Sequence, residues 1–520
     1  MKIRMKSILK VVFSRMFFVG LLILLQVVFL VFIAIKLNNY FIYVHIASIL
    51  ISILIMFSII NTNKEPSFKL LWAMLILTFP LAGILLFLVI GDNKTKKKFV
   101  KIANRLSKEV SHIYTEKQHH YLQIQSQLEK EDKVMYGQSR YITSVTNMPV
   151  YQNTNTEFLP TGEKYFERLV EELKKAKHFI FLEFFILTEG KMLDTVIEIL
   201  TQKVKEGVDV RLMYDDLGSI YVLRDGYDKY LRSLGIKCTI FNKFAPILSI
   251  GHNNRDHRKI VVIDGYIGFT GGINLADEYI NVFEKHGHWK DTGIVLTGEA
   301  VQNLTLMFLH SWYCFSEEED QDFTRFLPQV DYENLFVSDG YVQPYSDTPL
   351  DQEPVAENIY LNIIEQATDY VYITTPYLII DYAMLTALSR AAKRGVDVRI
   401  ITPHIPDKWF VFTLTQSYYT PLVKSGVTIY EYTPGFIHAK GFICDDKVAT
   451  VGSVNLDYRS FWHHFECGVW LYKSKSVHQM KEDFLETQSK SMVMTKEELK
   501  KIPFLNKFVR FFIKFLAPFL

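Results

Sequence analysis

The chain opens with apolar residues concentrated in three long stretches, Met16 to Ile35, Ile42 to Ile60 and Leu70 to Ile90. Each stretch is close to the roughly 20 residues that a helix needs to cross a hydrocarbon core about 30 Å thick. Basic residues precede the first stretch, as in a signal peptide. Its length and the second stretch close behind it favour a retained anchor. We therefore expect residues 1–92 to form an α-helical transmembrane region with two or three spans.

Basic residues on both sides of this region bear on its orientation. They precede the first stretch, and lysines crowd again between Lys94 and Lys101 after the third. The positive-inside rule favours the cytoplasmic side for both groups, whereas three full crossings would separate them. The third stretch, interrupted by Pro80 and Gly83, is the candidate for an incomplete crossing, with three plain crossings as the alternative. We expect a multi-pass protein of the cell membrane whose remaining domains are cytoplasmic.

Residues 93–140 are polar, poor in glycine and rich in Lys, Glu and Gln. This composition is typical of a basic helical connector, whose lysines would contact anionic lipid at up to about 1 kcal/mol each. A solvated helix has the same pattern. The tail, residues 496–520, places Lys507, Arg510 and Lys514 on one helical face and phenylalanines largely elsewhere. It predicts an amphipathic helix that either lies in a membrane interface or covers the protein core.

Helical and strand periodicities alternate between these regions. Residues 161–177 have helical spacing and residues 178–187 form an apolar strand. The helix Met192 to Lys205 and the strand Val208 to Tyr214 follow. From Val355 onwards the same order of elements returns. Such alternation is typical of an α/β fold.

A short repeat shows that the two series are copies. The pentapeptide Gly-Val-Asp-Val-Arg begins at Gly207 and again at Gly395, in each case after helix, strand and helix. We predict two tandem α/β domains with mixed sheets, residues 141–335 and 336–495, which together form one pseudo-twofold unit. The segment between Leu327 and Pro354, rich in Pro, Asp, Ser and Gly, joins them.

Charge excludes one large class of partner. Lys and Arg number 58 against 56 Asp and Glu, so the net charge is only +2 and no basic field favours nucleic acid. The chain also lacks a G-x-x-x-x-G-K-[ST] loop, which leaves nucleotide hydrolysis without support.

The chemistry-bearing residues form one motif, H-x-K-x4-D-x6-G-[GS]-x-N, that occurs twice. A histidine and a lysine two apart share a face of a strand, the glycine allows close approach of the backbone to a ligand, and the asparagine adds an amide donor. This combination predicts a phosphate site. The two copies contain His257, Lys259, Asp264, Gly271, Gly272 and Asn274, and His438, Lys440, Asp445, Gly452, Ser453 and Asn455.

Two imidazoles suit the cleavage of a phosphodiester. One neutral histidine attacks phosphorus while the other, protonated, donates to the departing oxygen. Lys259 and Lys440 would hold the non-bridging oxygens, and Asn274, Asn455, Gly272 and Ser453 would complete the substrate-binding set. Because fixed cations already neutralise the phosphate, no metal or other cofactor is expected.

The duplicated motif resembles that of the phospholipase D superfamily. The resemblance implies a covalent phosphohistidine on His257, with His438 as acid and base. It also implies that acidic residues downstream of each motif, by position Asp291 and Glu466, orient the histidines by accepting from the other ring nitrogen. The motif aspartates Asp264 and Asp445 belong to the predicted catalytic set, in which a structural role is expected for them.

Within the superfamily, nearly the whole chain is similar to bacterial cardiolipin synthases. The segments that carry this similarity are Asn254 to Lys259, Gly271 to Tyr279, Thr375 to Tyr377, Gly435 to Lys440 and Asn455 to Phe461. The resemblance implies transfer of a phosphatidyl group between two phosphatidylglycerol molecules in the membrane, giving cardiolipin and glycerol. The alternatives are a hydrolase, another acceptor alcohol, a nuclease, or a non-catalytic lipid-binding scaffold. Oligomeric state and the attacking histidine stay open.

One residue departs from the family pattern. His464, preceded by His463, stands two residues before Glu466, where the family usually has asparagine. The change puts local hydrogen bonding and acceptor preference in question. Adjacent histidines on a strand face opposite ways, so we do not expect the pair to hold a metal together.

Overall fold

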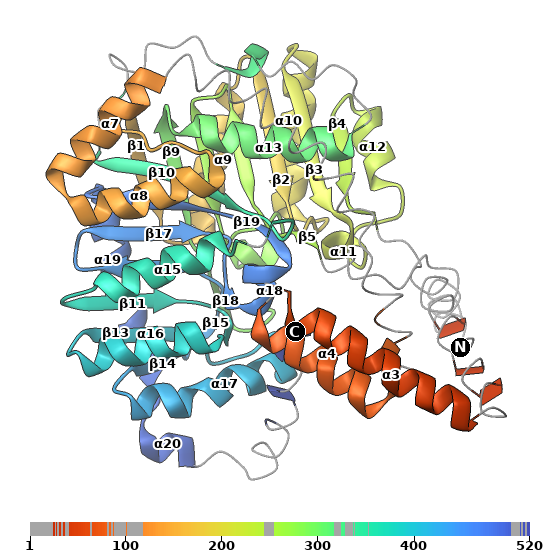
Figure 1. Ribbon diagram of the computed structural model, residues 1–520. Coiled ribbons are helices and arrows are strands. Elements are labelled where there is room, and N and C mark those ends of the chain that lie inside the picture. Colours follow the sequence, from red (N-terminus) through yellow and green to blue (C-terminus); the bar gives the residue numbers. More distant parts are fainter. Residues whose placement is uncertain are drawn as a thin grey trace. The chain divides into compact units, whose positions relative to one another are not determined.

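The computed structural model describes residues 41–62, 65–80, 118–243, 254–316, 324–327, 339–351 and 353–500, with scattered residues elsewhere. Two compact units make up the chain (Figure 1). The first combines residues 1–100 with 243–254, and the second combines residues 101–242 with 255–520.

The first unit contains two apolar helices, α3 (Phe41–Ile60) and α4 (Pro66–Thr78). The Glu65 side chain caps α4 by accepting from the backbone N–H groups of Ser67 and Phe68. Within the described residues, no helix has both the length and the apolarity that a membrane crossing requires. Most of the first predicted span and part of the third lie outside the described residues.

The second unit is built on two mixed β-sheets. The first follows the order β1–β9–β7–β6–β2–β3–β4, in which β2, β3 and β4 are parallel and the other neighbours antiparallel. Its strands are β1 (Thr154–Leu159), β2 (Phe179–Phe184), β3 (Asp209–Asp215), β4 (Lys237–Phe241), β6 (Ile260–Ile263), β7 (Ile267–Gly271) and β9 (Gly293–Gly298).

The second sheet has the order β10–β19–β17–β16–β11–β13–β14–β20. Its strands are β10 (Tyr341–Asp347), β11 (Tyr370–Thr374), β13 (Asp397–Pro403), β14 (Thr428–Tyr432), β16 (Gly441–Cys444), β17 (Val448–Gly452), β19 (His464–Tyr472) and β20 (Ser491–Val493). Apart from β20, each strand has a counterpart at the same place in the first sheet. The two tandem α/β domains predicted from the repeat are confirmed.

Helices cover both faces of each sheet. In the first domain they are α9 (Gly162–Lys175), α10 (Lys191–Lys205), α11 (Asp216–Ser219), α12 (Tyr227–Ser233), the 3-10 helix η3 (Asp277–Ile280) and α13 (Val301–Phe315). The 3-10 helix η4 (Thr324–Phe326) also packs on the first sheet, through Phe326 against Phe179 and Phe181. In the second domain the helices are α15 (Val355–Gln366), α16 (Tyr382–Lys393), α17 (Trp409–Lys424), α18 (Tyr458–Trp462), α19 (Lys475–Ser489), α20 (Lys496–Lys500) and η5 (Ala517–Phe519).

Strand β2 shows how the core is divided. Leu182 belongs to the apolar cluster formed with α9 and α10, whereas Phe181 points the other way and stacks on Phe308 of α13 at 4.5 Å between ring centroids. Alternate residues of this fully buried strand therefore face opposite sides of the sheet. Figure 1 shows α13 lying across this sheet.

The predicted connector folds as a helical hairpin of α7 (Gln118–Glu131) and α8 (Lys133–Thr146). Because α8 continues past residue 140, connector and first domain are not separated there. Gln138 of α8 accepts a hydrogen bond from Trp470 Nε1 at 3.0 Å, and Ser139 donates to Gln343 at 2.8 Å. These buried contacts attach the hairpin to the sheet of the second domain.

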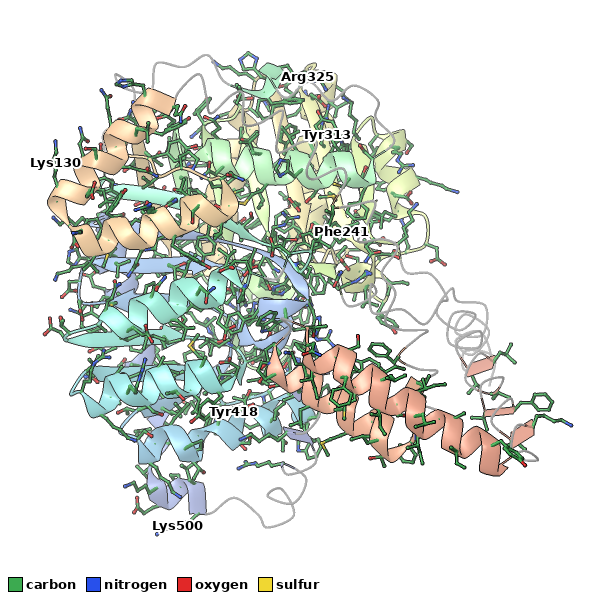
Figure 2. All side chains as sticks on the ribbon, viewed as in Figure 1. Lys130, Phe241, Tyr313, Arg325, Tyr418 and Lys500 are labelled. Atoms are coloured by element: carbon green, nitrogen blue, oxygen red, sulfur yellow. The ribbon has the colours of Figure 1, made fainter. Side chains whose placement is uncertain are left out.

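The described residues of the tail also contact the second domain. Arg510 donates to Gln416 of α17 at 2.6 Å, and the Lys514 ammonium lies 4.8 Å from the ring centroid of Tyr418, which is labelled in Figure 2. Ala517 is buried. These contacts favour the expectation that the tail covers the core. Most of residues 501–520 lie outside the described residues.

Candidate active site

Two small parallel strand pairs cross between the domains and hold the motif histidines. Strand β5 (Arg255–Asp256) pairs with the start of β19, and β8 (His288–Lys290) pairs with β15 (Gly435–Ile437). His257 N–H then donates to the Phe465 carbonyl at 2.9 Å, and His438 N–H donates to the Lys290 carbonyl at 2.7 Å. Each histidine is therefore fixed by the backbone of the other domain.

The side chains cross between the domains in the same way. His257 Nδ1 lies 2.9 and 3.0 Å from the two carboxylate oxygens of Glu466, and His438 Nδ1 lies 2.6 Å from Asp291 Oδ2. When Nδ1–H donates to a carboxylate, the lone pair of the neutral ring is on Nε2. Both acidic residues predicted to orient histidines do contact one. Each carboxylate contacts the histidine of the other motif, a pairing that sequence spacing did not show.

The second residue of each Gly-[Gly/Ser] pair lies against one of these carboxylates. Ser453 Oγ donates a short hydrogen bond to Glu466. A Cβ atom on Gly272 would lie 2.1 Å from Asp291 Oδ1, so only glycine leaves room for that carboxylate. Gly272 and Ser453 were predicted to bind substrate, and the contacts seen here are with the carboxylates that position the histidines.

The two lysines are buried beside the histidines. Lys259 Nζ donates to the backbone carbonyl of His257, and Lys440 Nζ donates to that of His438. Burial lowers the pKa of Lys259 to about 8 and that of Lys440 to about 7, against the opposing effect of nearby carboxylates. A bound anion would favour the charged form of both ammonium groups.

Burial, followed by the charge of the neighbouring lysines, holds the pKa of His257 and of His438 well below the usual value. Without an anion both imidazoles are therefore neutral at physiological pH. Burial also raises the pKa of Asp291 to about 7, although Lys440 and Lys259 oppose this shift. Because the histidines and lysines of the site are buried, a negatively charged substrate would change their protonation balance.

The motif asparagines differ in their contacts. Asn274 Oδ1 accepts from the Ile186 backbone N–H at 3.0 Å, and its Nδ2 donates to Tyr279 Oη at 2.7 Å. One N–H of the Asn274 amide remains for a ligand. The Asn455 side-chain oxygen is buried without a hydrogen-bond partner among the described residues.

The motif aspartates are engaged by the backbone instead. Asp264 accepts from the N–H groups of Lys177, His178 and Phe179 at 2.7–2.9 Å, and Asp445 accepts from those of residues 368–370 at 2.7–2.9 Å. Both adopt positive φ angles, 51° and 53°. These contacts agree with the structural role expected for both aspartates, because the carboxylates fix the loops that precede β2 and β11.

Aromatic rings that motif spacing did not reveal flank the two histidines. The ring centroid of His438 lies 5.5 Å from that of Trp289 and 5.6 Å from that of Tyr279. The ring of His257 lies 5.2 Å from Phe185 and 5.3 Å from His464. Trp289 precedes Asp291 by two residues, as His464 precedes Glu466, and this shared spacing is the signal that could have identified Trp289.

His463 and His464 face opposite sides, as expected for neighbours at the start of a strand. His463 Nε2 lies 3.3 Å from the Pro518 carbonyl, whereas His464 points to His257. Burial lowers the pKa of His464 to about 3, so its ring is neutral.

Two paired sheets that converge on a pair of His–Lys motifs define a phospholipase D-like protein. The sequence agrees, because residues 169–312 and 360–487 match the family described as cardiolipin synthase, PLD-like domain. The chain belongs to this family of enzymes. Residues 50–91 match a second family, the phospholipase D-nuclease N-terminal region.

Relatives extend over most of the chain. A cardiolipin synthase of Alkalihalophilus pseudofirmus is 34% identical over 91% of this chain and 92% of its own length. An uncharacterized protein of Streptococcus mutans is 43% identical over 89% of this chain and 98% of its own length. Among solved structures, phosphatidylserine synthase of Haemophilus influenzae shares the fold, with a TM-score of 0.53 at 15% identity over 74% of this chain and all of that one.

Proposed function

We propose that the enzyme transfers a phosphatidyl group from one phosphatidylglycerol molecule to a second, giving cardiolipin and glycerol. The observation that carries the proposal is the pair of crossed dyads, His257 with Glu466 and His438 with Asp291. Two neutral imidazoles with oriented Nδ1 atoms and two buried lysines supply a nucleophile, an acid–base group and charge neutralisation for a phosphodiester.

In the first half-reaction, His257 Nε2 attacks phosphorus and the bond to the glycerol oxygen breaks. His438, protonated once the anionic phosphodiester is bound, gives its proton to that oxygen, and glycerol leaves. Lys259 and Lys440 neutralise the non-bridging oxygens as charge develops on them. The product is phosphatidyl-His257, whose positive ring is stabilised by Glu466.

In the second half-reaction, neutral His438 takes the proton from a hydroxyl group of the second phosphatidylglycerol. The resulting oxygen nucleophile attacks phosphorus, the P–N bond to His257 breaks, and cardiolipin is released. Walls formed by Trp289, Tyr279 and Phe185 keep water away from the intermediate, which favours transfer over hydrolysis.

The first experiment is incubation of the purified full-length protein, in detergent, with phosphatidylglycerol alone. We expect cardiolipin and glycerol in equal amounts by mass spectrometry. The variants His257→Ala and His438→Ala should each fall to background, because each removes a group that the other histidine does not replace. The variant His178→Ala, at an exposed histidine, is the control and should keep wild-type turnover. Phosphatidic acid without cardiolipin would mean that water is the acceptor.

We further propose that residues 1–92 anchor the enzyme as a multi-pass protein in the bacterial cell membrane, with its catalytic domains in the cytoplasm. Support comes from α3, whose side chains Ile46, Leu50, Leu54 and Phe57 are 55–68% exposed. Contiguous exposed apolar side chains on a helix are unfavourable in water and favourable in lipid. Reporter fusions after Lys101 should be active only on the cytoplasmic side, and activity confined to the outside would refute the orientation.

A further inference from the structure

The catalytic dyad of His257 and Glu466 has a third potential metal ligand beside it, His464, which the transfer reaction does not use. His257, His464 and Glu466 each offer one nitrogen or oxygen atom, and these atoms all lie within 4.8 Å of one another. His464 is the residue that departs from the asparagine expected at this position. The residue is only 7% exposed.

The contacts of His464 are incomplete. Within the part of the chain that the structure describes, neither of its ring nitrogens has a hydrogen-bond partner. Its Nδ1 lies 3.7 Å from Glu466 Oε1, which is too far for a hydrogen bond. One ring nitrogen of a neutral imidazole always carries a lone pair. Burying that nitrogen without a hydrogen-bond donor costs free energy. The lone pair therefore needs either a donor or a cation.

Two of the three donor separations lie close to those around a tetrahedral transition metal, and all three lie within 4.8 Å. Ligand atoms about 2.0–2.2 Å from zinc lie roughly 3.3–3.5 Å apart around a tetrahedron. The separations from Glu466 Oε1 to His257 Nδ1, 2.9 Å, and to His464 Nδ1, 3.7 Å, bracket that value. Two histidines and one glutamate are also a ligand set that zinc takes in enzymes, with the fourth position open.

We propose that His257, His464 and Glu466 form an inhibitory binding site for a divalent metal of the zinc class. The metal replaces the proton between His257 Nδ1 and Glu466. In the neutral ring that proton moves to Nε2, where it removes the lone pair that attacks phosphorus. Occupation of the site therefore stops phosphatidyl transfer without changing the fold. The inhibition, though not the binding, rests on the proposed function.

The test is titration of metal-free, full-length protein with Co²⁺, whose visible absorption reports tetrahedral ligation without any lipid substrate. We expect one Co²⁺ per wild-type chain, displaced by Zn²⁺. The variants His464→Asn and His464→Phe, the second a ring without ligand atoms, should bind at least about tenfold more weakly and lose the tetrahedral absorption. His463→Asn, whose ring faces the other way, is the matched control and should bind like wild type.

Activity gives the second readout. Zn²⁺ should inhibit cardiolipin formation by the wild type and by His463→Asn, with recovery on chelation, and inhibition of the His464 variants should need at least tenfold more metal. The proposal is overturned if the wild type binds no Co²⁺ at micromolar concentration, or if the His464 variants bind as tightly as wild type. Co²⁺ binding without cardiolipin synthesis would sink the proposed function and leave the metal site standing.

Discussion

At the residue scale, some residues of each motif take part in the chemistry and others stabilise the local structure. His257 and Lys259 lie at the catalytic site, whereas Asp264, five residues after Lys259, accepts three backbone N–H groups at the opposite end of β6. A strand separates the two ends of the motif, so a fixed spacing can serve both purposes. The same division holds for His438, Lys440 and Asp445.

The carboxylate partner of His257 leads to a prediction for activity. We expect Glu466→Gln to lower kcat by on the order of 10²–10⁴-fold, because glutamine can hold the wrong tautomer and cannot stabilise a positive phosphohistidine. Steady-state kinetics in the presence of a chelator would measure this. Glu299→Gln, which alters the His120–Glu299 contact of 3.3 Å elsewhere in the molecule, should change kcat by less than about twofold.

Asp264 leads to a prediction for stability. Asp264→Ala leaves three backbone N–H groups without an acceptor and places alanine at a φ of 51°. We expect a loss of about 3 kcal/mol in the free energy of unfolding. Asp264→Asn retains one acceptor and tolerates the left-handed backbone, so its loss should be clearly smaller. Denaturant unfolding of the full chain compares the two, and equal losses would contradict this account.

The contribution of Asp445 to the free energy of unfolding depends on pH. Burial raises its pKa, but the backbone N–H groups of residues 368–370 outweigh this effect, and the net pKa lies below the ordinary value of 3.8. A carboxyl group with a lowered folded pKa contributes stability above its unfolded pKa and loses it as the pH falls through the folded one. The stability advantage of wild type over Asp445→Asn should therefore be constant near neutrality and shrink below about pH 4. Melting curves across this range would show it, and an unchanged advantage at pH 3 would contradict it.

At the scale of elements, two very short strand pairs fix the site. Strands β5 and β15 contribute two and three residues, yet each sets the backbone immediately before a catalytic histidine. Strand β5 pairs with β19 and strand β15 pairs with β8, in each case a strand of the opposite domain. This pairing holds the backbone of each histidine in place. The preorganisation of the site is therefore a property of the interface between domains.

Gly435 is the point at which this pairing is most sensitive. A Cβ atom there would lie 2.3 Å from the His288 carbonyl oxygen, which belongs to the paired strand β8. We expect Gly435→Ala to separate β15 from β8, move His438 and lower kcat by at least about 10²-fold, since misplacement by about 1 Å has effects of that size. Initial rates would measure the loss.

Gly137 provides the matched control. It lies in α8, exposed, with nothing within 4 Å of an added Cβ. Gly137→Ala should leave kcat unchanged and stabilise the helix by about 0.5–1 kcal/mol. Equal activity of the two alanine variants would show that strand pairing at β15 does not position the histidine.

At the scale of the whole molecule, the two domains repeat one sheet order and share one site. Neither domain contains a complete dyad, since His257 and Asp291 come from the first and His438 and Glu466 from the second. The pseudo-twofold arrangement is nevertheless asymmetric. His438 lies beside Trp289, whereas His257 lies beside the polar ring of His464.

Because both histidines of a site come from one chain, mixing inactive variants should not restore activity. We expect co-expressed His257→Ala and His438→Ala chains to stay at background for cardiolipin formation, measured in lipid extracts by mass spectrometry. Co-expression of either variant with wild type gives the reference for expression level. Restored activity in the mixture would mean that domains are exchanged between chains.

The sequence by itself determined the two-domain α/β organisation, the extent of α10 to within one residue, the histidines and lysines, and the two carboxylates. These features depend on local periodicity and on spacing within one motif, which the linear order preserves. Only the tertiary structure decided which carboxylate contacts which histidine, the attachment of the α7–α8 hairpin to the second domain, and the rings of Trp289 and His464 beside the site. Those contacts join residues up to hundreds of positions apart, and their geometry is set by how two folded sheets pack, which no local pattern encodes.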